Sequence, residues 1–94
     1  MANRRSIKKD IQFIIHDLID ECCAYIILKG DEKEAQINVI IDQSVEVYDD
    51  LMKRVNNHNN LSGKEVKAHF NAIYSDLEEK SIELTKALNK SIAA

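Results

Sequence analysis

Hydrophobic residues recur every three or four positions along three segments of the chain, the spacing that gathers side chains on one face of an α-helix. In residues 6–28 the intervals are 4, 3, 4, 4 and 3, an eleven-residue rhythm that keeps the apolar stripe nearly straight along a helix. Its positions are Ile7, Ile11, Ile14, Leu18, Cys22 and Tyr25. Ile15, Ile19 and Ile26 widen the stripe. The pattern therefore predicts a helix that contacts two neighbours.

The same spacing predicts helices over residues 32–56 and 63–92. The stripe of the second segment is Ile37, Ile40, Ile41, Val47, Tyr48, Leu51 and Val55. The stripe of the third is Val66, Phe70, Ile73, Leu77, Ser81, Leu84, Leu88 and Ile92. The helix expected over residues 63–92 is longer than the one over residues 6–28 and extends past it. Either its end frays, or something else covers Leu88 and Ile92.

The first two helices are separated by a short break at Gly30. Glycine suits the left-handed residue after a helix end, and Asp31 with Glu34 matches the N-cap and N3 positions of a following helix. A connection this short turns the second helix back antiparallel to the first.

Residues 56–60 contain four asparagines and predict a loop, because Asn accepts turn geometries. Ser62 and Glu65 then form the pattern of a capping box, and Leu61 is placed to pack on Val66 as a hydrophobic staple. The third helix is therefore expected to start directly after Ser62.

These elements predict an all-α fold, an antiparallel up-down-up three-helix bundle, with helices at about 6–28, 32–56 and 63–92. The 94 residues form a single domain, with residues 1–5 as a flexible basic tail. A chain of this length buries roughly 65% of its unfolded surface, so its core is thin. Dimerisation into a larger bundle would add to that core.

The formal net charge of −3 disfavours a general nucleic-acid binder, which needs a concentrated basic surface. The basic residues Arg4, Arg5, Lys8 and Lys9 favour a solvated helix entry, with contact to anionic lipid or phosphate as the alternative. The sequence contains no apolar run long enough to cross a membrane, so we expect neither nucleic acid nor a membrane as partner.

The spacing of His16 and Asp20, and of Glu65 and His69, places each pair on one helix face, which by itself is a weak metal signal. His16 is expected to face solvent, and His69 to pack at a helix boundary or to hydrogen-bond a neighbouring helix. We therefore predict no metal site and no cofactor.

Adjacent Cys22 and Cys23 diverge on a helix and are poorly placed to form a disulfide, which indicates a reducing, cytoplasmic setting. Both are expected to be inert packing residues. Ser44 and Ser81 fall in apolar stripes, where they either bond a backbone carbonyl and allow close helix approach or select the register of an oligomer. The sequence thus predicts no catalytic residue and no enzyme.

Phe13, Ala24 and Ile27 lie on the back of the first helix, away from its apolar stripe. Scattered exposed hydrophobic residues are normal, but these three, with Leu88 and Ile92, form a candidate interface for a homodimer. The leading hypothesis is a non-enzymatic cytoplasmic module for protein–protein interaction or assembly that associates with itself.

The alternative is a small regulatory, inhibitor or adaptor protein that binds a foreign partner protein through an acidic helix surface. The residues that would supply this charge are Glu46, Asp49, Asp50, Glu78, Glu79 and Glu83. Amphipathic helices with ordinary caps occur in many unrelated proteins, so the fold alone assigns no function.

Overall fold

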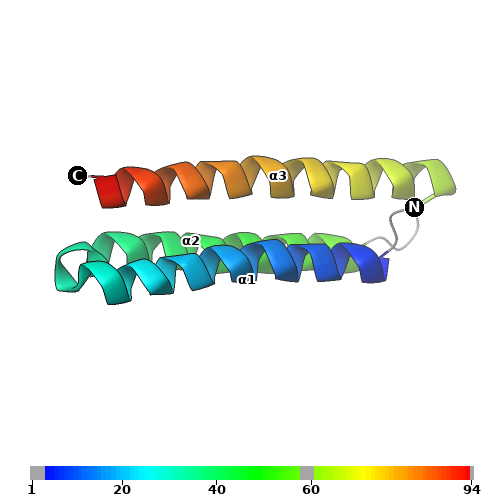
Figure 1. The fold of residues 1–94 in the computed structure, drawn as a ribbon. Helices are drawn as coiled ribbons and strands as arrows, with labels where there is room; N and C mark the ends of the chain where they lie inside the picture. The colour runs from blue at the N-terminus through cyan, green and yellow to red at the C-terminus, as the bar shows by residue number, and fades with distance from the viewer. Residues whose placement is uncertain (1–3, 58–60, 94) are drawn as a thin grey trace.

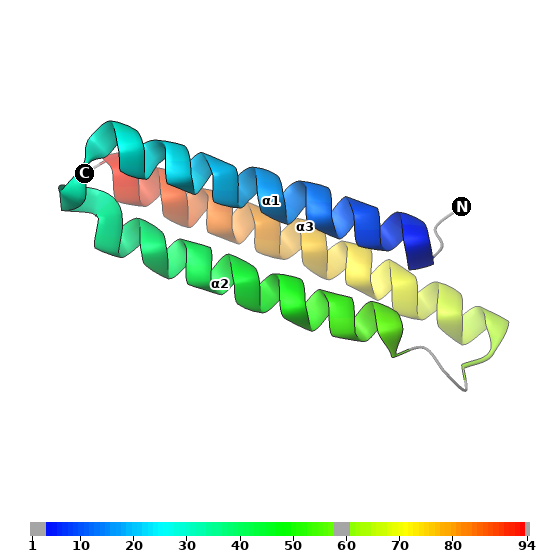
Figure 2. The same ribbon diagram turned by 90° about the horizontal axis from the view of Figure 1, so that it is seen from below.

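The computed structural model describes the backbone of residues 4–57 and 61–93. These residues form three helices: α1 (Arg4–Lys29), α2 (Asp31–Asn56) and α3 (Gly63–Ala93). The helices alternate in direction, and α3 runs alongside both α1 and α2 and contacts each of them (Figures 1 and 2). The bundle is slender, with extents of 50 × 19 × 17 Å. The predicted antiparallel three-helix bundle is confirmed.

The helix bounds differ from the expected ones by at most two residues. Helix α1 begins at Arg4 rather than at residue 6, so residues 4 and 5 are helical instead of forming part of a tail. Residues 1–3 of that expected tail, and residues 58–60 of the expected asparagine loop, lie outside the described residues.

The core consists of two hydrophobic clusters that follow each other along the bundle. The first packs the amino-terminal half of α1 against the end of α2 and the beginning of α3; its buried members are Ile7, Ile11, Ile15, Leu51, Val55, Phe70, Ile73 and Leu77. The second lies toward the turn between α1 and α2; its members are Leu18, Cys22, Ile37, Ile40, Leu84 and Leu88. The predicted stripes are therefore the buried faces, with Ile15 more deeply buried than Ile14.

The turn between α1 and α2 consists of Gly30 alone. Its backbone angles are φ 72° and ψ −160°, a region open in practice only to glycine, and its N–H donates to the Ile26 carbonyl at 3.0 Å. Because the turn is so short, Asp31 is already the first residue of α2, and Gly30 precedes it without a capping side chain. The expectation that Asp31 is the N-cap was therefore wrong.

Helix α3 begins where the sequence predicts. The backbone N–H of Glu65 donates to Ser62 Oγ at 3.3 Å, and the N–H of Val66 donates to the Ser62 carbonyl at 2.9 Å. The side chain of His69, one turn further on, donates from Nε2 to the Arg54 carbonyl at 2.6 Å. Since carbonyls in the last turn of a helix lack intrahelical donors, His69 ties the end of α2 to α3.

The carboxyl-terminal part of α3 is helical to Ala93 and packs on its own chain. Leu88 is wholly buried in the second cluster, and Ile92 is half-buried against it. The monomer itself thus covers this end of α3.

Candidate functional site

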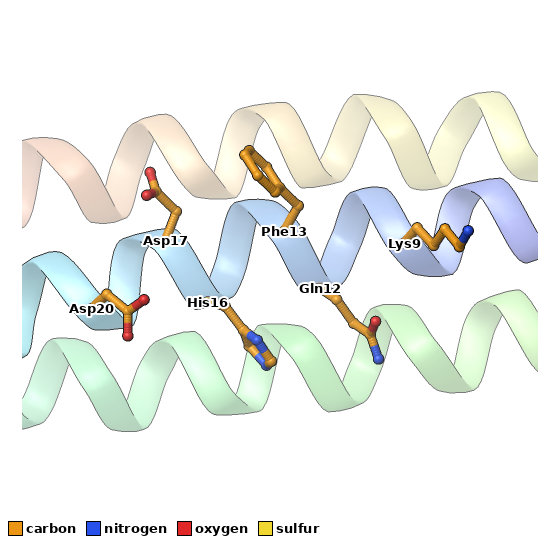
Figure 3. Close-up of a pocket in the computed structure, with 6 residues that line it drawn as sticks. All are labelled: Lys9, Gln12, Phe13, His16, Asp17 and Asp20. Atoms are coloured by element: carbon orange, nitrogen blue, oxygen red, sulfur yellow. The ribbon is translucent and has the colours of Figure 1, made fainter.

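The outer face of α1, which we define as Lys9, Gln12, Phe13, His16, Asp17 and Asp20, points away from the core. These six residues surround an open hollow of about 370 Å³ (Figure 3). All six come from α1, so the hollow is a feature of a helix surface and not a cleft between elements. Five of its six lining residues are polar or charged, and the sixth is the apolar ring of Phe13.

Phe13 is 75% exposed although its helix is buried along the opposite face. It lies on the α3 side of the hollow, while Gln12 and His16 extend toward α2 (Figure 3). The sequence predicts this exposure, because Phe13 falls outside the apolar stripe of its helix.

On the side of the outer face nearest α2, His16 and Gln12 contact Tyr48 of α2. The imidazole of His16 stacks on the Tyr48 ring with centroids 6.1 Å apart and planes inclined by 25°. Gln12 Nε2 donates to the Tyr48 hydroxyl at 3.4 Å, a long hydrogen bond. His16 is exposed, as expected, but its ring has a fixed neighbour.

The structure separates the five residues of the expected interface into two groups. Ile27 is 81% exposed, and Ala24 is also exposed, on the same side of α1 as Phe13. Leu88 and Ile92 belong instead to the second core cluster, and Leu88 has no exposed surface with which to meet a partner. The accessible part of this set is therefore confined to α1.

Sequence reasoning missed four other exposed hydrophobic residues: Leu28, Val39, Val45 and Ile82. Leu28 is 76% exposed and extends the surface around Ile27 at the end of α1. A helical wheel places Leu28 and Ile82 away from their stripes, so this signal was present in the sequence.

A second surface feature is the groove between α2 and α3. Four carboxylates, two cations and two apolar side chains line it: Glu46, Asp50, Asp76, Glu79, Arg54, Lys80, Val47 and Leu51. Arg54 Nη1 donates to Asp76 Oδ2 at 2.6 Å and lies 3.9 Å from Asp50 Oδ2. Much of the negative charge is thus balanced within the groove.

The expected acidic surface is divided between two sides of the bundle. Glu46, Asp50 and Glu79 line the groove between α2 and α3. Glu78 lines a different groove, between α1 and α3, beside Tyr74. The six carboxylates therefore do not form one continuous face.

Tyr74 connects α3 to α1 at this other groove. Its hydroxyl donates to Asp10 Oδ2 at 2.6 Å. This hydrogen bond, together with burial and the charge of Asp10, raises the pKa of Tyr74. The phenol consequently stays protonated and serves as a donor between helices.

Three of the reactive side chains that the sequence singled out, Cys22, Ser44 and Ser81, are engaged within the bundle. The expectation that Cys23 also packs was wrong, because its side chain is exposed. Burial, followed by the neighbouring Cys23 and Glu21, raises the pKa of the Cys22 thiol to about 11, which disfavours the nucleophilic thiolate. Ser44 Oγ donates to the Ile40 carbonyl at 2.8 Å, and Ser81 Oγ to the Glu78 carbonyl at 2.9 Å. Ser44 is wholly buried, whereas Ser81 is only half-buried.

Within residues 4–57 and 61–93, no three His, Cys, Asp or Glu side chains gather closely enough to hold a metal ion. In the same part of the chain, no helix is both long and apolar enough to cross a membrane. In comparisons with known proteins, no family model, no curated protein and no solved structure matches the chain.

Proposed function

We propose that this protein is a non-enzymatic module for protein–protein interaction or assembly, and that it forms a homodimer through the outer side of α1. The observation that carries the proposal is the position of Phe13, an aromatic ring 75% exposed beside an open hollow. Burying such a ring contributes about 1.5–3 kcal/mol, and a two-fold dimer buries two of them.

Further apolar surface on α1 supports the same side. Ile27 and Leu28 are 81% and 76% exposed, and the smaller Ala24 is exposed near them. One exposed hydrophobic residue is normal on a monomer, but a group along one side of a helix is typical of an interaction surface. The thin core of a chain this short gives association an additional benefit.

The proposal that the module has no catalytic activity rests on the engagement of its reactive groups. Burial holds Cys22 as a thiol, and Ser44 and Ser81 bond backbone carbonyls. His69 is committed to the Arg54 carbonyl. The proposal keeps the reducing, cytoplasmic setting expected from the sequence, which the free thiols of buried Cys22 and exposed Cys23 support.

The direct test is the solution mass of Phe13→Asp, measured by size-exclusion chromatography with light scattering across a concentration series. The wild-type chain should be dimeric at high micromolar concentration, and Phe13→Asp should be monomeric with unchanged helical circular dichroism. Val39→Asp is the matched control, because Val39 is 54% exposed on α2 and the same charge is introduced. A wild-type monomer, or a dimer that Phe13→Asp leaves intact, would overturn the proposal.

A second candidate function is supported by the groove between α2 and α3. We infer that a foreign partner with a basic helix would meet four carboxylates there, against the two cations Arg54 and Lys80. A regulatory, inhibitor or adaptor role of this kind relies on electrostatic attraction, which added salt screens.

The two functions respond differently to charge reversal in this groove. Glu46→Lys with Glu79→Lys should abolish salt-sensitive capture of a foreign partner and leave self-association unchanged. Phe13→Asp should have the opposite effect. If the groove variant retains every captured protein, the regulatory alternative fails.

A further inference from the structure

The outer face of α1 carries a particular order of charges along one line. Lys9, Phe13, His16 and Asp20 follow each other at intervals of four, three and four residues, so they share one side of the helix. A cation stands at one end of this line and an anion at the other, with two rings between them (Figure 3). Gln12 and Asp17 flank the line on its two sides.

These six positions are symmetric about the level between residues 14 and 15. Residue 9 is as far from that level as residue 20, residue 12 as residue 17, and residue 13 as residue 16. Two copies of such a helix face become complementary when one is turned end to end against the other.

We propose that a second copy of this chain docks on the outer face of α1 with its own α1 antiparallel, and that a two-fold axis passes between residues 14 and 15. Lys9 of each copy then faces Asp20 of the other, which makes two ion pairs across the dimer. This inference rests on the proposed self-association and specifies its direction and register.

Charge decides between the antiparallel and the parallel arrangement. A parallel pair would set each Lys9 opposite the other Lys9 and each Asp20 opposite the other Asp20. Like charges facing each other disfavour association, whereas the antiparallel pair neutralises both ends. Within the described residues neither side chain has an ion pair on its own chain, so both are available.

Charge also disfavours two other antiparallel registers. Sliding the second copy until Phe13 meets Ile27 would bury more apolar surface, but it would place Asp20 opposite Asp20 on the two-fold axis. A smaller shift would set Lys9 opposite Ile27 and leave the ammonium group without a carboxylate. The register centred between residues 14 and 15 pairs both charges of the line, and Ile27 and Leu28 lie beyond the segment that it pairs.

The rings fit the same register. Phe13 of one copy lies level with His16 of the other, and the His16 imidazole is already positioned by its stacking on Tyr48 at 6.1 Å. A ring that is fixed before binding loses less conformational freedom when a partner packs on it. Gln12, which donates to Tyr48, lies level with Asp17 of the second copy.

The test is a pair of charge reversals, Lys9→Glu and Asp20→Lys, studied separately and mixed. Each variant alone would oppose like charges twice, so its dimer should be weaker, with a Kd raised about tenfold or more. An equal mixture restores both ion pairs in the heterodimer. Sedimentation equilibrium, with one variant carrying a fluorophore, should show preferential pairing between the two variants.

Lys86→Glu and Asp42→Lys are the matched controls, because both side chains are exposed and lie on α3 and α2. This pair should dimerise as the wild type does, separately and mixed. Circular dichroism of every variant establishes that the bundle is folded.

The outcomes distinguish this inference from the function on which it rests. Weaker dimers of both single variants, together with preferential pairing of Lys9→Glu with Asp20→Lys, support the antiparallel register. Single-variant dimers as strong as the wild type would overturn it, because a parallel pair already sets like charges opposite each other. A wild-type dimer that Phe13→Asp disrupts, but in which the two reversals show no preference for each other, overturns the register and leaves self-association standing. A wild-type chain that remains monomeric overturns both.

Discussion

Cys22 and Cys23 are neighbours in the chain but lie in opposite environments. Cys22 is wholly buried in the second cluster, whereas Cys23 is exposed. Burial, with the neighbouring Cys23 and Glu21, raises the pKa of the Cys22 thiol from 9.0 to about 11. A step of one residue rotates the side chain by about 100° around the helix axis, and this rotation separates a packing group from an accessible thiol.

This difference predicts how stability depends on pH. Because the pKa of Cys22 is raised in the folded chain, its contribution to stability is fully present below pH 9.0 and is lost as the pH rises toward about 11. The loss amounts to at most about 1.4 kcal/mol per pH unit in that window. Urea unfolding of the wild type and of Cys22→Ala, at pH values on both sides of 9.0, measures it.

Cys22→Ala should be less stable than the wild type at neutral pH, because a buried side chain becomes smaller, but it should lose less stability as the pH rises. The difference between the two chains removes the titration of lysines and tyrosines that both contain. If the stability of the wild type and of Cys22→Ala fell in parallel as the pH rises, the raised pKa of Cys22 would be contradicted.

At the scale of elements, the ends of the helices are fixed by different means. Helix α3 begins with a local side-chain cap, Ser62, whereas α2 begins directly after Gly30 without one. Gly30 occupies φ 72° and ψ −160°, and nothing lies within 4 Å of the position a Cβ would take. Backbone conformation, and not crowding, is therefore what requires glycine there.

Gly30→Ala should lower the free energy of unfolding by about 1–3 kcal/mol, the cost of a backbone region reserved for glycine. Gly30→Asn should be similarly harmful, because asparagine tolerates the left-handed helical region but not this one. Gly63→Ala is the control: it lies in the first turn of α3 with nothing near its Cβ, so it should be neutral or stabilising. Chemical denaturation compares the three, and equal stabilities would refute the argument.

At the scale of the whole molecule, the bundle is long and thin, and its two clusters hold different ends together. Helix α1 packs more extensively on α2 than on α3, and the hydrogen bond from Tyr74 to Asp10 adds a polar tie between α1 and α3. At the opposite end, Leu88 brings α3 into contact with the cluster beside the Gly30 turn. Tyr74 and Leu88 thus join α3 to the rest of the bundle at two separate places along its length.

Leu88→Ala should therefore destabilise the chain by about 2–5 kcal/mol, the usual cost of a cavity at a fully buried leucine. Ile92→Ala should cost clearly less, because Ile92 is only half-buried. Urea denaturation gives both values, and amide hydrogen exchange should show the last turns of α3 losing protection in Leu88→Ala. Equal effects at the two positions would mean that this end of α3 is not packed as described.

The sequence by itself determined the three helices, their buried faces and the cap of α3, because hydrophobic periodicity and capping act between residues a few positions apart. It also indicated that Phe13, Ala24 and Ile27 lie off the buried stripe. The sequence did not specify the one-residue turn, which makes Asp31 the first residue of α2 rather than its cap.

Only the tertiary structure decided which partners meet across the bundle. Tyr74 and Asp10 are 64 positions apart, and His69 reaches the Arg54 carbonyl on another helix. The rotation of α3 against its neighbours buried Leu88 and placed Glu79 in one groove and Glu78 in another. A helical pattern specifies which face of each helix is apolar, but the rotation and offset of one helix against another follow from how side chains of all three fit together.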